Sequence, residues 1–539
     1  MPVGYEQPLF VYSGGFMTDI KIYSSLEKIF DDCVPAGEIT GLSMLRNEIL
    51  SFQIVFDTDD SCSFSVKSDI PDNISLFRVE NVPVNLPYYE DHDDFVIERG
   101  KGLYPDLLVP VTDYNLKPGR TVIWADIEPG NTFAGKHDIV FRSGDSEKRF
   151  NLEIIDRESE NIEFIYTNWY HADCLCDYYG VEAMSDEFFE VNRKFISMAV
   201  KNGMNCILTP LFTPPLDTDI GGERTTIQLV SVIIKDDGYE FDLSNLKRWI
   251  DMCRECGIKY FEMSHLFTQW GARATPKVMA LDSDGKEKRI FGWDVSSADE
   301  KYISFLTQLS AALDKFFIGE GIKDKVFFHI SDEPSKDDID NYKACAGVMK
   351  SIFPDYKFMD ALSDYDFYQL GYVDIPVPCE HKFAPFVSNV PDLWVYHCCG
   401  QYRNHLPNRF IAMPSIRNRI LGLLFYAYDI KGFLQWGYNF YNSHLSKSHI
   451  NPFECTDAGE VFPSGDSFVV YPGPGGEPYP SLRLKVFRDA LQDLKAFRSC
   501  KSDEAIEYLK SATDGIGFEN YFTSPGKLLE IREKINHLL

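Results

Sequence analysis

The feature that most restricts the fold is a long alternation of short apolar runs with helical stretches, beginning near residue 163. Several helical stretches end at a glycine, as at Gly203 and Gly257. Continuous apolar strands separated by helices are typical of a parallel sheet that is buried on both faces. The eight apolar runs occupy residues 163–170, 205–210, 258–267, 325–330, 356–364, 372–378, 393–399 and 432–440.

Eight strand–helix units predict an α/β fold, specifically a (β/α)8 barrel of the TIM type. The alternative is an open, doubly wound sheet, which would usually carry a glycine-rich phosphate turn after its first strand. Here the first strand runs into TNWYHADCLC, residues 167–176, which contains no glycine. The barrel is therefore favoured.

The first 157 residues follow a different pattern, with short alternating runs and many turn signals. This pattern predicts an N-terminal β-sandwich that precedes the barrel. We expect three parts: the sandwich over residues 1–157, the barrel over 158–500, and a charged helical extension over 501–539. The clearest strand-like runs are LSFQIVFDT (50–58), TVIWADIEP (121–129) and KRFNLEIID (148–156).

Charge and cysteine content narrow the expected partners and location. The chain has 53 basic and 82 acidic side chains and a net charge of −29, which disfavours nucleic acid as a partner. No run of about 20 apolar residues is present, so we expect no membrane insertion. The 13 scattered cysteines are typical of free thiols, and the N-terminus lacks a signal-peptide pattern. A cytoplasmic location is expected, and the oligomeric state stays open.

Two adjacent acids, Asp332 and Glu333, end the fourth apolar run in KVFFHISDEPSKDDID, residues 325–340. Barrel enzymes carry their catalytic residues at the C-terminal ends of the strands, so the pair is a candidate catalytic site. Pro334 is expected to hold Glu333 in an extended conformation. The simpler alternative is a solvated acidic loop.

Adjacent acids suit one kind of glycoside hydrolysis better than another. The common mechanism places two carboxyl groups roughly 5–10 Å apart, on opposite sides of the scissile bond. Neighbours in sequence suit substrate-assisted hydrolysis, in which the 2-acetamido oxygen of the sugar is the nucleophile. One acid would then protonate the leaving oxygen and the other would hold the acetamido N–H. An ionised Asp332 would also raise the pKa of Glu333 by like-charge repulsion.

These residues carry a family resemblance. HISDEP, residues 329–334, is similar to the His-x-Gly-x-Asp-Glu motif of family 20 β-hexosaminidases. Most of the chain resembles glycoside hydrolase family 123, the β-N-acetylgalactosaminidases, and its broader uncharacterised relatives. The stretches that carry this resemblance are RNEILSFQIVF (46–56), KGLYPDLLVPV (101–111), VFFHISDEP (326–334), GFLQWGYNFY (432–441) and PSLRLKVFRDALQD (480–493).

The resemblance implies a sandwich followed by a barrel, with no metal and no organic cofactor. It implies an exo-acting, retaining enzyme that removes terminal β-N-acetylgalactosamine from glycans or glycosphingolipids. Carried onto this chain, Glu333 is the general acid/base and Asp332 orients the acetamido group. The preference for N-acetylgalactosamine over N-acetylglucosamine is implied by the resemblance alone.

Aromatic and histidine side chains near the ends of the predicted strands are candidates for substrate binding. Ordinary barrel packing is the alternative for each of them. His329 can also be a core histidine that hydrogen-bonds Asp332. The candidates are Trp169, His265, His329, Tyr396, His397, Trp436 and Tyr438.

Two other functions stay open from the sequence. One is a two-carboxylate retaining glycosidase, with Glu333 as acid/base and Glu380 or Glu262 as a separate nucleophile. The other is a non-catalytic glycan-binding protein, which would keep the aromatic platforms without needing the acids. CREC, residues 253–256, has zinc-like spacing, but no second cysteine pair follows it at a suitable distance, so no metal site is expected.

Overall fold

The computed structural model describes residues 18–33 and 35–539. The chain forms two compact units. The first contains the residues up to Val79 together with Val109–Glu158, and the second contains Glu80–Leu108 and Ser159–Leu539. Residues 80–108, which the sequence places in the N-terminal domain, thus pack as part of the second unit.

Two five-stranded sheets contain the strands of the first unit, and they share one hydrophobic core. Phe52 of one sheet stacks on Phe150 of the other, with 3.9 Å between ring centroids. Alternate residues point inward, as the period of a half-buried strand requires. The first sheet has the order β1 (Thr18–Ser24), β3 (Leu50–Thr58), β8 (Gly119–Ile127), β5 (Ile74–Val84), β6 (Gly102–Pro110). The second has the order β2 (Gly41–Leu45), β10 (Ser146–Ile155), β9 (Gly135–Ser143), β4 (Cys62–Ser68), β7 (Asn115–Leu116). The end of β5 and most of β6 fall within residues 80–108.

The second unit contains a nearly closed barrel of eight parallel strands, and every predicted apolar run supplies one of them. A parallel bridge between Cys379 and Tyr396 joins the two strands at the ends of the sheet order. The interior is packed with apolar side chains such as Leu208, Met359 and Leu434. In sheet order the strands are β20 (Ile375–Val377), β19 (Lys357–Ala361), β18 (Val326–Phe328), β15 (Tyr260–Met263), β12 (Cys206–Thr209), β11 (Ile165–Asn168), β22 (Gly432–Gln435) and β21 (Trp394–His397).

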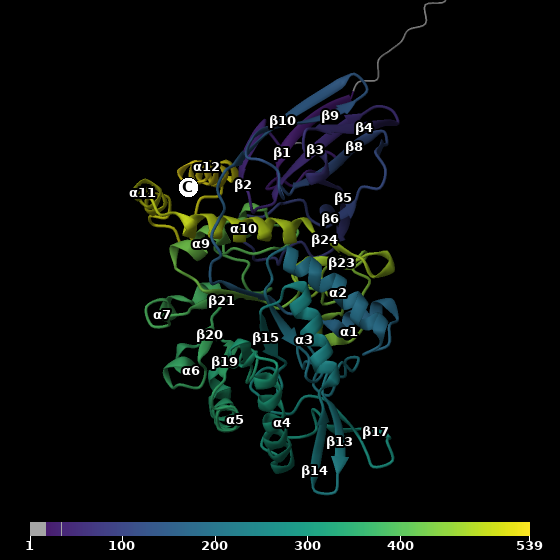
Figure 1. Cartoon of the computed structure of the whole chain (residues 1–539), viewed down its shortest axis with the longest axis vertical. Helices are drawn as coiled ribbons and strands as arrows, with labels where there is room; N and C mark the ends of the chain where they lie inside the picture. The colour runs from purple at the N-terminus through teal and green to yellow at the C-terminus, as the bar shows by residue number, and fades with distance from the viewer. Residues whose placement is uncertain (1–17, 34) are drawn as a thin grey trace, which may run out of the picture. The chain divides into compact units, whose positions relative to one another are not determined.

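Helices connect successive strands of this barrel. In Figure 1 the helix α10 lies alongside α9, and both pack outside the barrel strands. A serine caps α2 and another caps α10, as helix N-termini require. The helices up to residue 500 are α1 (Ala172–Tyr179), α2 (Asp186–Lys201), α3 (Ser244–Cys256), α4 (Glu300–Gly319), α5 (Ile339–Ile352), α6 (Tyr365–Gln369), α7 (Ala384–Val387), α8 (Ile416–Arg419), α9 (Leu421–Ala427) and α10 (Leu482–Ser499).

Insertions in the barrel loops form smaller sheets that the sequence does not predict. The loops after β12 and β15 supply a four-stranded sheet, of which β13, β14 and β17 are labelled below α3 and α4 in Figure 1. A two-stranded sheet forms within residues 470–480. The strands are β13 (Ser231–Lys235), β14 (Gly238–Asp242), β16 (Val278–Leu281), β17 (Glu287–Phe291), β23 (Val470–Pro472) and β24 (Pro478–Pro480).

The C-terminal segment contains two helices, α11 (Asp503–Ala512) and α12 (Pro525–Leu538). Leu528 and Ile535 of α12 are fully buried, and Arg532 lies 3.4 Å from Asp493 of α10. This segment is therefore packed on the barrel unit. Among the described residues, no helix combines the length and apolar character needed to cross a membrane.

Candidate active site

The acid pair lies directly beyond the C-terminal end of β18, as the barrel prediction requires. The backbone at Glu333 differs from the prediction, because its φ of 42° is left-handed and not extended. Pro334 disfavours a right-handed helical conformation at Glu333. The Glu333 N–H donates to the Ala361 carbonyl at 3.0 Å and holds the turn. A left-handed non-glycine residue costs on the order of 1–3 kcal/mol, which is typical of functional sites.

Both acids open into one cavity of about 180 Å³ at this end of the barrel. Three tryptophans form much of its wall, and the described lining residues include no lysine or arginine. The lining consists of Trp169, Leu216, Asp217, Gln269, Trp270, Asp332, Glu333, Ala361, Tyr396, Cys398, Cys399, Leu434, Trp436, His444 and Phe462.

The two acids have perturbed pKa values. The Glu333 side chain reaches solvent in the cavity, yet the surrounding protein desolvates it and raises its pKa, while Tyr396 opposes that rise. Desolvation, followed by repulsion from Glu333, raises the pKa of Asp332 well above its usual range. The sequence predicted that Asp332 would raise the pKa of Glu333; in the structure, burial is the principal cause for both acids.

Tyr396 positions Glu333. Its hydroxyl donates a hydrogen bond of 2.5 Å to Oε1 of Glu333. A hydrogen bond to the charged form of an acid lowers its pKa, which explains the opposing contribution of Tyr396. Tyr396 was predicted as a substrate-binding residue; it lines the cavity and contacts the acid directly.

Trp169 and Trp436, both predicted from the sequence, line the cavity with their indole N–H groups held by buried acids. Trp169 Nε1 donates to Glu262 at 3.0 Å, and Trp436 Nε1 donates to Asp466 at 2.9 Å. Burial raises the pKa of Asp466 to about 7. These hydrogen bonds fix the orientation of both rings, so the two tryptophans form a rigid inner wall.

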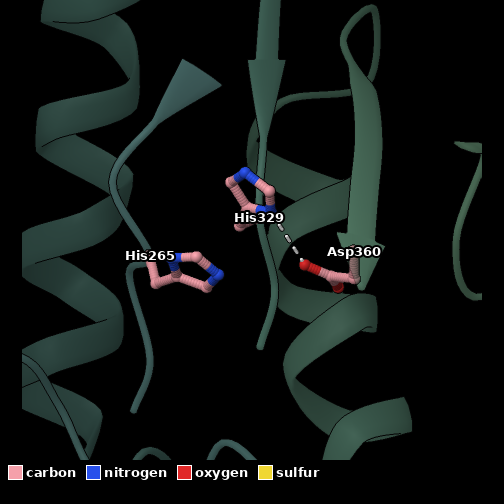
Figure 2. A group of neighbouring side chains, drawn as sticks. All are labelled: His265, His329 and Asp360. Atoms are coloured by element: carbon pink, nitrogen blue, oxygen red, sulfur yellow. Dashed lines mark hydrogen bonds and ion pairs between the residues drawn. The ribbon is translucent and has the colours of Figure 1, made fainter. Parts of the chain in front are cut away.

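His265 and His329 do not line the cavity, which corrects their prediction as substrate-binding residues. Both are fully buried. His329 Nε2 lies 2.9 Å from Glu262, and Nδ1 lies 3.2 Å from Asp360 (Figure 2). His329 lies two residues after Phe327, so its side chain points to the same side of β18. Phe327 packs in the barrel interior, and His329 therefore points into that interior, below the acids. The hydrogen bond from His329 to Asp332 that the sequence allowed does not form.

The same cluster is an unsuitable metal centre, although two histidines and Asp360 lie close together. The rings of His265 and His329 stack at 4.2 Å between centroids and 17° between planes (Figure 2). The lone pairs of an imidazole lie in the plane of its ring, so two stacked rings cannot both direct them at one ion. The geometry instead supports an imidazolium at His329 held by two carboxylates.

His397 and Tyr438 also lie outside the cavity, against prediction. His397 is buried and lies 3.1 Å from Glu380, because it faces away from the barrel interior that its neighbour Tyr396 enters. The Tyr438 hydroxyl donates to the Phe195 carbonyl at 2.9 Å in the helix layer. His397 does not reach the cavity because adjacent residues of a strand point to opposite faces, and its neighbour Tyr396 takes the inward-facing position.

Several cavity residues were not singled out from the sequence. Asp217 is the most notable, because desolvation raises its pKa to about 6 and His444 opposes that rise. Its Oδ2 accepts from the Leu445 N–H at 3.1 Å. It lies eight residues beyond the end of β12, and its position after a barrel strand was the available signal. The others are Leu216, Gln269, Trp270, Ala361, Cys398, Cys399, Leu434, His444 and Phe462.

Comparison with known families decides the classification. The family model described as the glycoside hydrolase 123 catalytic domain matches residues 169–500, which is more than half of the chain. The chain belongs to glycoside hydrolase family 123. It is therefore a glycoside hydrolase, and the matched segment contains the acid pair and every lining residue of the cavity.

One solved structure agrees with the family 123 fold. It is a family 123 glycoside hydrolase from Clostridium perfringens studied for glycolipid glycan hydrolysis, and it superposes with a TM-score of 0.71 at 15% identity. The match covers 97% of this chain and all of that one. A xyloglucanase of family 5 from Bacteroides ovatus matches at 8% identity and a TM-score of 0.30, over 84% of this chain and 98% of its own. No curated protein sequence matches the chain.

Proposed function

We propose that this family 123 enzyme is an exo-acting, retaining β-N-acetylgalactosaminidase whose (β/α)8 catalytic barrel follows a β-sandwich in the sequence. Its substrates are glycans or glycolipids that end in β-N-acetylgalactosamine. The observation that carries the proposal is the adjacent pair Asp332–Glu333, which opens into one cavity with fixed tryptophan walls. Glycolipid hydrolysis by the Clostridium perfringens relative supports the substrate class.

In the proposed mechanism the substrate supplies the nucleophile. The acetamido oxygen attacks the anomeric carbon while Glu333 donates its proton to the departing glycosidic oxygen. Asp332 accepts a hydrogen bond from the acetamido N–H. The positive charge that develops on the oxazolinium intermediate favours the ionised form of Asp332 against its raised pKa, and the carboxylate in turn stabilises that charge. Glu333, now a carboxylate, removes a proton from water, which opens the intermediate and restores the acetamido group. The raised pKa of Glu333 suits a proton donor near neutral pH.

The two acids considered for a two-carboxylate mechanism lie outside the cavity. Glu262 is fully buried and is held by Trp169 and His329. Glu380 is also fully buried, beside His397, and burial raises its pKa well above the usual range. A carboxyl group that is fully buried and does not line the cavity makes no contact with a sugar carbon bound inside it. The geometry therefore favours the substrate-assisted mechanism over either assignment.

Asp217 is a third candidate for a nucleophile, because its side chain lies on the cavity wall. It tests the two-carboxylate alternative better than Glu262 or Glu380. Asp217→Asn with azide is the decisive variant: a glycosyl azide product would assign the nucleophile to Asp217. We expect no azide product, because the acetamido group replaces an enzymic nucleophile.

Three aryl glycosides test the proposed function directly. We expect turnover of the β-N-acetylgalactosaminide and, depending on O4 recognition, of the β-N-acetylglucosaminide. The β-galactoside should be inert, since galactose has no acetamido group. Release of aryl alcohol is followed by absorbance. Equal turnover of the β-galactoside and the β-N-acetylgalactosaminide would refute acetamido assistance.

Variants of the two acids should fail differently. Glu333→Gln removes the proton donor, which is typically worth 10²–10⁴-fold on a natural glycan and much less on an aryl glycoside with a good leaving group. Asp332→Asn should slow both substrates alike, because it weakens the acetamido attack itself. Rates on both substrates are compared with those of Tyr438→Phe, whose hydroxyl lies outside the cavity. A fully active Asp332→Asn enzyme would contradict the proposed role.

A further inference from the structure

The three tryptophans of the cavity differ in how they are held. Trp169 is 3% exposed and Trp270 is 42% exposed, and Trp436 is intermediate. The N–H groups of Trp169 and Trp436 are fixed by Glu262 and Asp466. Among the described residues, Trp270 is the only large, exposed apolar side chain that also lines the cavity. An exposed tryptophan at a site entrance leaves a large apolar face available to a ligand.

The backbone under Trp270 is unusual. Trp270, Gly271 and Ala272 all have left-handed φ values, of 55°, 105° and 54°. A Cβ at Gly271 would lie 2.4 Å from the Asp338 side chain, so only glycine fits there. Left-handed non-glycine residues cost on the order of 1–3 kcal/mol each and persist only where the surroundings hold them. The loop is therefore kept in this shape by its contacts.

Those contacts come from the segment that carries the acid pair and from the helix behind it. The Ser331 hydroxyl accepts from the Gly271 and Ala272 N–H groups at 3.3 and 3.1 Å. The Trp270 N–H donates to the Asp332 carbonyl at 2.9 Å. Asn341 of α5 donates to the Ala272 carbonyl at 2.7 Å. Trp270 is thus tied through its own backbone to one of the two acids.

The loop after β12 is hydrogen-bonded to Gln269, the residue that precedes Trp270. The Gln269 side chain accepts from the Asp217 N–H at 2.6 Å and donates to the Thr218 carbonyl at 3.0 Å. The loop after β12 and the loop after β15 therefore meet at the cavity mouth. The backbone of Trp270 is therefore held by a hydrogen bond to the segment of the acid pair, and its neighbour Gln269 is joined to the loop after β12 through the Gln269 side chain.

We propose that Trp270 is the platform for the leaving-group side of the substrate, on which the apolar face of the sugar next to the terminal residue stacks. This inference rests on the proposed function, and it names the part of the substrate that the exposed face of Trp270 binds. The general acid must act on the bond between the terminal sugar and the leaving group. Trp270 is hydrogen-bonded to Asp332 through its backbone and is open to solvent. It can therefore contact the leaving group, which lies on the outer side of that bond.

The Glu333→Gln enzyme permits a binding experiment, because its turnover of a natural disaccharide is expected to be about 10²–10⁴-fold slower. Calorimetric titration compares free N-acetylgalactosamine with a disaccharide that carries β-linked N-acetylgalactosamine on galactose. In this background, Trp270→Ala should weaken disaccharide binding about five- to tenfold, which corresponds to an aromatic stacking contribution of about 1 kcal/mol. The dissociation constant of the monosaccharide should change by less than about twofold on the same substitution.

Two matched variants sharpen the experiment. Trp270→Phe keeps an aromatic face, so it should retain most of the disaccharide affinity. Phe133→Ala removes an exposed aromatic side chain of the first unit, 71% exposed, and should change neither affinity. Unchanged monosaccharide binding also shows that each Trp270 variant is folded.

The outcomes separate the inference from the proposed function. Equal weakening of monosaccharide and disaccharide by Trp270→Ala would place Trp270 in the inner site and overturn the inference. Unchanged binding of both sugars would overturn it as well. If the Glu333→Gln enzyme with Trp270 intact binds neither sugar, the proposed function itself fails, and the inference fails with it.

Discussion

Tyr396 and Glu333 form the contact that most directly sets the protonation of the candidate acid. The Tyr396 hydroxyl stabilises the Glu333 carboxylate and so lowers its pKa. Tyr396→Phe should therefore raise the pKa of Glu333. Because the acid must be protonated to act, the alkaline limb of the kcat/KM profile should move to higher pH. A complete pH–rate profile on an aryl substrate measures it.

Tyr438→Phe is the matched control for this prediction, since it removes a tyrosine hydroxyl that donates to Phe195 outside the cavity. Its alkaline limb should coincide with that of the unsubstituted enzyme. An alkaline limb that stays in place or moves to lower pH in Tyr396→Phe would contradict the assignment of Glu333 as the acid.

His329 links pH to stability. Burial lowers its pKa, but hydrogen bonds to Asp360 and Glu262 outweigh burial and raise it from 6.5 to about 9. A group whose pKa is raised on folding stabilises the protein fully below its unfolded pKa and loses that contribution as pH rises through the folded value. Between pH 6.5 and about 9, the free energy of unfolding should fall by on the order of 3 kcal/mol from this group.

Urea unfolding below pH 6.5 and above pH 9 measures this effect. His329→Gln should be less stable at the lower pH, because two buried carboxyl groups lose their cation. Its stability should also depend less steeply on pH across this range. An equally steep dependence in the variant would show that other groups control it.

At the residue scale, the acid pair and its place at a strand end were predictable, because a buried strand that stops at two acids is visible in the sequence. The roles of the histidines were not. His265, His329 and His397 all lie near strand ends, but each points into packed structure. A residue number along a strand gives the position of a side chain, whereas its direction depends on the exact register and on the bend at the strand end.

The helices of the C-terminal segment belong to the packing of the barrel unit. Ile535 of α12 is fully buried, whereas Ile506 of α11 is 45% exposed. Ile535→Ala should lower the free energy of unfolding by about 2–5 kcal/mol, the usual cost of a large-to-small change in a core. Ile506→Ala, the same chemical change at an exposed site, should cost under about 0.5 kcal/mol. Chemical denaturation of both variants checks this, and equal costs would contradict the packing of α12.

At the scale of elements, the eight barrel strands were predictable because each is an apolar run between helices. The four-stranded sheet of β13, β14, β16 and β17 was not, because its strands come from two separate loops. Strand β14 has no buried residue and β17 has one, and both lack a continuous apolar run. Pairing between distant segments is a tertiary event, which a local sequence pattern does not report.

At the scale of the molecule, the net charge of −29 and the absence of basic residues among the described lining side chains should disfavour anionic surfaces. A neutral glycolipid with terminal β-N-acetylgalactosamine should be cleaved more slowly in anionic vesicles than in neutral ones at low salt. Added salt should narrow the difference, because ions screen exposed charges over about 10 Å at 0.1 M.

The control is a soluble, uncharged aryl substrate, whose turnover should change little with salt. Product release from both vesicle types is measured by chromatography of the freed sugar. Faster cleavage in anionic vesicles at low salt would show that a local basic surface outweighs the overall charge.

The sequence by itself determined the order of the barrel strands and the place of Asp332 and Glu333, because both depend on local patterns of apolar and acidic residues. Only the tertiary structure decided what surrounds that pair. Asp217, Trp270 and Tyr396 come from loops and strands far apart in the chain, and they meet because the strands close into a barrel. The pKa values follow from that closure too, since burial by distant segments is their principal physical cause.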